Sequence, residues 1–182
     1  MVYRDFAQGP QFVNDISALK AHAGGDCPEL TFKGILDAMN SSPLPGSPLY
    51  VFTDASAKDA SEDNFMEAVS FAREMGLTIN FFTTGNLCGN PSFKYFEDLA
   101  RETCGQMLLL PSHKELKKLS TITGISLTGT TCLGNGEDNN TSGKRKRSAT
   151  KQYAIPVDDS IEKIIVTVTT QNSGPAITLK DP

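Results

Sequence analysis

The segment PLYVFTD (48–54) constrains the fold most, because an uninterrupted apolar run is followed closely by an acid. The run from Leu49 to Phe52 contains β-branched and aromatic side chains, which is typical of a strand that helices cover on both faces. Asp54 then stands at the carboxyl end of this strand, where open parallel sheets bind their ligands. The acid therefore has two interpretations: it belongs to a binding site, or it caps the turn that follows.

The segment GGDCPELTFKGILDAM (24–39) predicts a Gly-rich acidic turn that opens a helix. Asp26 suits the N-cap position, with Pro28 just inside the helix and Glu29 three residues after the cap, as in a capping box. The expected apolar stripe, at i, i+3, i+4 and i+7, consists of Phe32, Ile35, Leu36 and Met39. Capping needs no ligand, so it is an alternative to a binding role for Asp26.

Helices and strands alternate with short loops along the rest of the first part of the chain. The expected elements are a helix from Ser61 to a stop at Gly76, a strand over 77–85, a helix that opens at 90–91 and a strand over 106–110. Such alternation predicts a parallel sheet with right-handed crossovers. A stand-alone doubly wound domain generally has more than three strands. Residues 2–6 form the end of another strand, or neighbouring sequence completes the sheet, or both.

The segments GGDCPE, PLYVFTDASAKD and INFFTTGNLC, in this order, resemble the von Willebrand factor A domain of hemicentin-type extracellular proteins. The resemblance runs from about the start of the chain to Leu119. It implies an α/β fold with a doubly wound, Rossmann-like and mostly parallel sheet over residues 1–120. It also implies that this domain is incomplete at its N-terminus.

In that family a divalent cation, usually magnesium, is held by three loops at the top of the sheet, and an acid of the partner protein completes its octahedron. The first loop, D-x-S-x-S, supplies most of the direct ligands, and no such motif with a suitable helix precedes Gly24. Asp54 matches the aspartate of the third loop, and Asp26 falls where many A domains carry a threonine ligand. The resemblance adds to this ligand edge Ser56, Gly85 and Asn86. Because one or two carboxylates hold hard cations weakly, we expect a weak, partial site for magnesium or calcium.

The four cysteines are Cys27, Cys88, Cys104 and Cys132. They show no C-x-x-C spacing, and with His22 and His113 as the other possible ligands they give little support for a zinc site. The resemblance places Cys27 and Cys88 at the ligand edge, where they would form a disulfide, and the other two would form a second pair. Four reduced thiols in a cytosolic protein are the alternative, which composition alone does not exclude.

Residues 121–151 are rich in Gly, Thr, Asn and Ser and predict a flexible polar linker. The basic run from Lys144 to Arg147 has three interpretations. It is a solvated charge cluster, a proprotein-convertase cleavage site, or a patch for nuclear import or for a polyanion such as a heparin-like glycan.

Residues 152–182 change character again and predict short strands around a QNSGP turn. They resemble the start of the β-rich, galactose-binding-like module that follows the A domain in hemicentin-like proteins. Three short strands do not bury a core unaided, so this segment is expected to dock on a neighbour, pair with another chain or stay partly ordered.

The resemblance implies a secreted glycoprotein of the extracellular matrix. The sequons at Asn40, Asn139 and Asn140 are glycosylation candidates on that basis. Met1 is followed by VYRDF and not by a basic and then apolar leader, so a signal peptide is expected upstream or is absent from this version of the chain. The formal net charge of -4 gives no reason to expect nucleic acid as a partner, and no apolar stretch is long enough to span a bilayer.

Two functional hypotheses of different classes remain. The first is a non-catalytic adhesion module that binds an extracellular protein through its ligand edge and, when the metal site is complete, through an acidic group of the partner. The second is a small magnesium-dependent phosphotransfer enzyme with Asp54 as nucleophile. The sequence favours the first, because Ser56 stands where a second acid is needed and neither histidine is placed beside a nucleophile. We therefore predict no catalytic residue.

Overall fold

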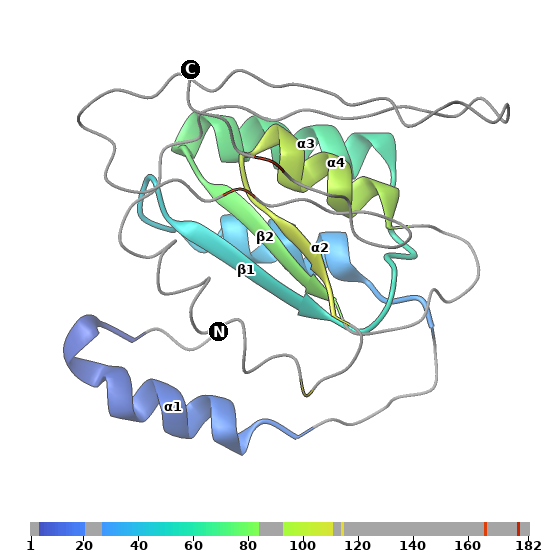
Figure 1. The fold of residues 1–182 in the computed structure, drawn as a ribbon. Coiled ribbons are helices and arrows are strands. Elements are labelled where there is room, and N and C mark those ends of the chain that lie inside the picture. Colours follow the sequence, from blue (N-terminus) through green and yellow to red (C-terminus); the bar gives the residue numbers. More distant parts are fainter. Residues whose placement is uncertain are drawn as a thin grey trace, which may run out of the picture.

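The computed structural model describes residues 4–20, 27–83 and 93–110, with the single residues 114, 166 and 178. In this part of the chain, three strands form a parallel sheet in the order β1-β2-β3 (Figure 1). The strands are β1 (Pro48–Thr53), β2 (Thr78–Thr83) and β3 (Met107–Leu109). The predicted α/β fold with a parallel sheet is confirmed.

Three helices pack on one face of this sheet (Figure 1). They are α2 (Thr31–Met39), α3 (Glu62–Met75) and α4 (Lys94–Glu102). Strand residues at alternate positions, among them Val51, Ile79 and Phe81, meet the helices in one apolar cluster. Phe81 lies at its centre, fully buried and stacked on Phe96 of α4 at a ring-centroid distance of 4.6 Å. Apolar burial on this face is therefore what joins the helices to the sheet.

The predicted apolar stripe of α2 is confirmed. Phe32, Ile35 and Met39 are buried, and Leu36 is partly buried against the same cluster. The helix is shorter than predicted, because it begins at Thr31 and not at the Gly-rich turn.

The predicted limits of α3 are confirmed by its capping contacts. The Ser61 hydroxyl accepts a hydrogen bond from the backbone N–H of Asn64 at 3.1 Å. Gly76 ends the helix with a φ of 65°, a left-handed conformation that glycine adopts without steric cost. Sequence signals at both ends thus fix this helix locally.

Two expectations for the strands are wrong. β1 is an edge strand of the described sheet, and Phe52 is 61% exposed, so helices do not cover both faces of that strand. The proposed strand near the start of the chain is also not formed over residues 4–6. Asp5 and Gln8 instead make a reciprocal capping box around a short 3-10 helix, η1 (Phe6–Gln8), because their side chains satisfy the free backbone N–H groups of that turn.

The structure contains a helix that the sequence interpretation missed, α1 (Gly9–Ala18). It follows η1 directly and has Pro10 in its first turn, a position that proline favours. Its apolar side chains, including Phe12 and Ile16, are exposed.

The predicted linker (121–151) lies outside the described residues. The predicted C-terminal module (152–182) lies there too, apart from two isolated residues. One of these, Val166, is exposed and has no strand assignment. Those domain divisions stay predictions.

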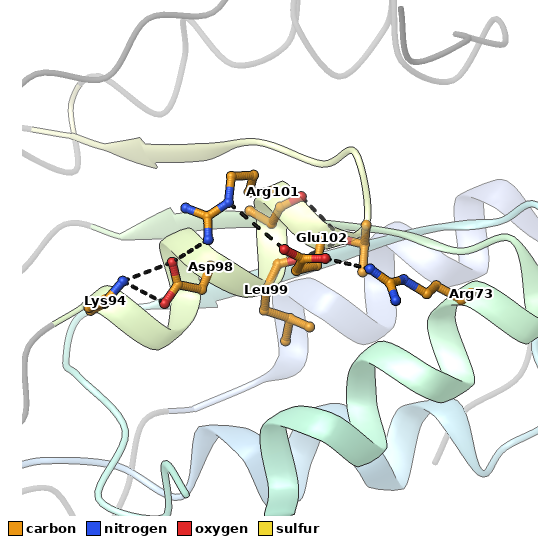
Figure 2. A network of polar contacts seen from close by, with 8 residues as sticks. Arg73, Lys94, Asp98, Leu99, Arg101 and Glu102 are labelled. Atoms are coloured by element: carbon orange, nitrogen blue, oxygen red, sulfur yellow. Dashed lines mark hydrogen bonds and ion pairs between the residues drawn. The ribbon is translucent and has the colours of Figure 1, made fainter. Parts of the chain in front are cut away.

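Charged side chains connect α3 and α4 at the surface, as Figure 2 shows. Asp98 pairs with both Lys94 and Arg101 at 2.8 Å, and Glu102 pairs with Arg73 of α3. Since such partly exposed pairs contribute about 0–1 kcal/mol each, this network adds little to the packing beneath it.

Adding one methyl group should have opposite effects at two glycines, Gly105 in the turn between α4 and β3 and Gly34 in helix α2. A Cβ on Gly105 would lie 1.8 Å from the carbonyl oxygen of Ile79, which is backbone and has little room to move. Gly105→Ala should lower the free energy of unfolding by about 3 kcal/mol or more, measured by urea denaturation. Gly34→Ala is the matched control, because nothing lies within 4 Å of the added Cβ in helix α2. It should raise the free energy by about 0.5–1 kcal/mol. Equal effects at both sites would contradict this packing.

Candidate functional site

The turn before α2 and the loop after β1 lie side by side at the carboxyl edge of the sheet. Glu29, at the end of GGDCPE, forms a parallel bridge with Ala57, in the loop after β1. Its N–H donates to the carbonyl of Ser56 at 2.9 Å, and its carbonyl accepts from the N–H of Lys58 at 2.8 Å. The start of α2 is therefore joined to the loop that carries Asp54.

Asp59 strengthens this connection by capping α2 from a distance in the sequence. Its Oδ1 accepts from the N–H of Phe32 at 3.2 Å and its Oδ2 from the N–H of Lys33 at 2.7 Å. Both N–H groups belong to the first turn of the helix, where they lack partners within the helix and where the helix dipole favours negative charge.

The predicted capping box at the start of α2 is wrong. Leu30 occupies the N-cap position without a side-chain cap, and both Pro28 and Glu29 precede the helix. Asp26, the predicted cap, lies outside the described residues. Because the carboxylate of Asp59 satisfies the first turn, the helix can begin at Thr31 without a local capping residue.

The structure does not support the interpretation of Asp54 as a cap of the turn that follows β1. Asp54 is exposed, and within the described residues its carboxylate makes no hydrogen bond or ion pair. The local turn is instead stabilised by Thr53, whose hydroxyl donates to the carbonyl of Ala55 at 3.0 Å and accepts from its N–H at 3.3 Å. Asp54 is thus free to contact a ligand.

Two buried hydroxyl groups belong to the same edge. Ser56 and Thr83 are both 0% exposed, and neither hydroxyl has a hydrogen-bond partner in the described part of the structure. Thr83 ends β2 directly opposite Thr53 of β1. Buried polar groups without partners are rare in native proteins, so this pair is notable. Ser56 was predicted to belong to the ligand edge, whereas Thr83 was not. Its position at the end of a buried strand was the signal that could have identified it.

These oxygens match the chemistry of a hard cation, but they are few. One free carboxylate and two hydroxyls are hard donors. Among the described residues, however, no group of three His, Cys, Asp or Glu side chains could hold a metal ion. A tight metal centre does not follow from this set.

Several predicted site residues lie outside the described residues, and they stay predictions: Asp26, Gly85, Asn86, Cys88, Cys132, Asn139, Asn140 and Lys144 to Arg147. Cys27 and Cys104 are each in a disulfide. The pairing of Cys27 with Cys88 is not described, so it too stays a prediction. Asn40 is exposed at the C-cap of α2.

Comparisons with known proteins agree with this architecture. The family model of the von Willebrand factor A domain matches residues 5–112. Hemicentin-2 of Mus musculus is 28% identical over 174 residues, which cover 94% of this chain. Hemicentin-1 of Mus musculus and of Homo sapiens are each 27% identical over 175 residues, again 94% of the chain. The chain spans about 3% of the length of these curated relatives.

The capping contact of Asp59 predicts a difference between two acids of one loop. Asp59→Ala removes the acceptor of two helix N–H groups and should lower the free energy of unfolding by about 1–2 kcal/mol. Asp54→Ala removes a carboxylate without a described partner and should change it by less than about 0.5 kcal/mol. Urea denaturation of both variants measures the difference. A larger loss from Asp54→Ala would show that Asp54 is a structural cap.

Proposed function

Because this chain belongs to the von Willebrand factor A domain family, in its hemicentin-type form, we propose that it is a non-catalytic extracellular adhesion module. It binds another protein at the carboxyl edge of its sheet. The observation that carries this proposal is Asp54, an exposed acid at a strand end without a described partner. A residue that contributes nothing to local capping, at the position where parallel sheets bind ligands, is explained by recognition.

The alternative, magnesium-dependent phosphotransfer, is less well supported. Such chemistry needs a second acid close to Asp54 to hold the ion. Ser56 occupies that position and is fully buried. On this proposal the edge contacts a partner and carries out no reaction.

A divalent cation would take part through Asp54, with Asp26 as a second carboxylate, in a weak site for magnesium or calcium. When bound, the cation would offer an open coordination position to an acidic group of the partner. The Ser56 and Thr83 hydroxyls are compatible with such an ion as hard oxygen donors.

The extracellular location is supported by the disulfides of Cys27 and Cys104, since disulfides persist in oxidising compartments. The exposure of Asn40 is compatible with glycosylation of its sequon. In the part of the chain that the structure describes, no helix combines the length and the apolar character that crossing a bilayer requires. A C-terminal galactose-binding-like module and glycan contact through Lys144 to Arg147 belong to this proposal as well.

The proposal predicts that adhesion depends on Asp54. The chain, secreted from mammalian cells behind an added signal peptide, should be retained on a decellularised fibroblast matrix. Asp54→Asn should reduce the retained amount at least about fivefold, because one central contact commonly dominates an interface. Glu74→Gln is the control. It makes the same change in charge in the last turn of α3, and it should leave retention unchanged. Equal retention of wild type and Asp54→Asn would refute the role of this edge.

The proposal also predicts weak metal binding. Calorimetric titration of magnesium or manganese should give a dissociation constant of about 1 mM or weaker, because few carboxylates are available. Any heat of binding should disappear in Asp54→Asn. A single micromolar site in the wild-type chain would contradict our interpretation of the ligand set.

A further inference from the structure

Cys27 and Cys104 are both disulfide-bonded, and they lie at opposite ends of the sheet. Cys27 stands two residues before Glu29, which is bridged to the loop after β1 at the carboxyl edge. Cys104 lies at the amino end, because the hydroxyl of the neighbouring Thr103 accepts a hydrogen bond from the N–H of Ile79, near the start of β2, at 3.1 Å. Beyond Ile79, β2 rises about 13 Å, whereas a disulfide needs two Cα atoms within about 7 Å. The two cysteines therefore belong to different disulfides.

The chain contains two other cysteines, Cys88 and Cys132, as partners for these two. Cys88 belongs to the segment 84–92, which connects the end of β2 with the start of α4. Because β2 and β3 are parallel, α4 starts at the carboxyl end of the sheet and returns the chain to the amino end. Cys88 would reach Cys104 only if its segment ran extended back along the whole of α4. Both ends of that segment are instead at the end of the sheet where Cys27 lies.

The backbone at Cys104 is a second observation. Helix α4 ends in a Schellman motif, in which the N–H of Cys104 donates to the carbonyl of Arg101 at 3.2 Å and the N–H of Gly105 to the carbonyl of Ala100 at 2.8 Å. Cys104 thus occupies the position after the helix that glycine usually takes, with a left-handed φ of 56°. This conformation is unfavourable for a residue with a Cβ, so the turn alone does not explain a cysteine here. The bond that its side chain makes does explain it.

We propose that Cys104 forms its disulfide with Cys132, which leaves Cys27 and Cys88 as the other pair. Residues 111–131 are long enough for this bond, since an extended chain spans about 3.3 Å per residue and the sheet is only about 20 Å long. The bond ties the predicted linker to the end of the sheet opposite Asp54. The chain after Cys132 therefore starts away from the candidate edge, which stays open to a partner. The pairing goes beyond the proposed function, and its consequence for adhesion rests on that function.

Peptide mapping of the unreduced, secreted chain tests the pairing. Trypsin places the four cysteines in four different peptides, 21–33, 74–94, 102–114 and 119–144. After alkylation of any free thiols and removal of N-glycans, mass spectrometry should find peptide 102–114 joined to peptide 119–144, and reduction should release both. A bond from 102–114 to either of the other two peptides would overturn the proposal. A bond between two copies of 102–114, or an alkylated Cys104, would overturn it as well.

Matched double variants test where the two bonds lie. Cys104→Gly with Cys132→Ser removes one bond and restores the residue that usually ends such a helix, so retention on the fibroblast matrix should be unchanged. Cys27→Ser with Cys88→Ser removes the bond at the candidate edge and should reduce retention at least about threefold, because a loosened edge must be ordered on binding. Far-UV circular dichroism verifies that both variants are folded.

Equal losses of retention in two folded variants would overturn the placement of the bonds at opposite ends of the sheet. If the wild-type chain itself is not retained, the proposed function fails, and the peptide map still decides this inference.

Discussion

The arrangement of the candidate edge depends on the contact between the carboxylate of Asp59 and the first turn of α2. The carboxylate satisfies two N–H groups that are 26 and 27 residues distant in sequence. Together with the bridge between Glu29 and Ala57, it joins the loop after β1 to the turn before α2. The end of β1 alone would not define a binding surface. Once a second loop is fixed beside it, the same edge becomes a defined surface with Asp54 exposed on it.

The sequence was sufficient where the stabilising contacts are local. Ser61 and Gly76 limit α3 through bonds within a few residues, and β2 was predicted as a strand from its own residues without reference to a distant partner. The start of α2 was predicted wrongly for the opposite reason, because its cap comes from the distant residue Asp59. The burial of Phe52 was also predicted wrongly, since a residue pattern does not show whether a strand lies inside a sheet or at its edge.

For the candidate site, the sequence identified Asp54 as a candidate but left its role open. Asp54 had two equivalent interpretations until Thr53 was seen to make the local turn contacts. Thr83 was missed because burial and the absence of a partner are properties of the packed molecule. Short polar residues at strand ends occur in most parallel sheets. Only the register of β1 and β2 shows that this threonine lies opposite the residue before Asp54.

The charge of the edge depends on whether a cation is held there. A lone carboxylate is negative, whereas the same carboxylate with a divalent ion is positive, and the ion is then the largest local charge. Under the proposed function, a cation would therefore let the edge contact an acidic partner group that Asp54 alone would repel. The described donors at this edge are one exposed carboxylate and two buried hydroxyls, so tight metal binding would need further ligands. On this proposal, whether the edge can bind an acidic partner group depends on how tightly it holds a cation.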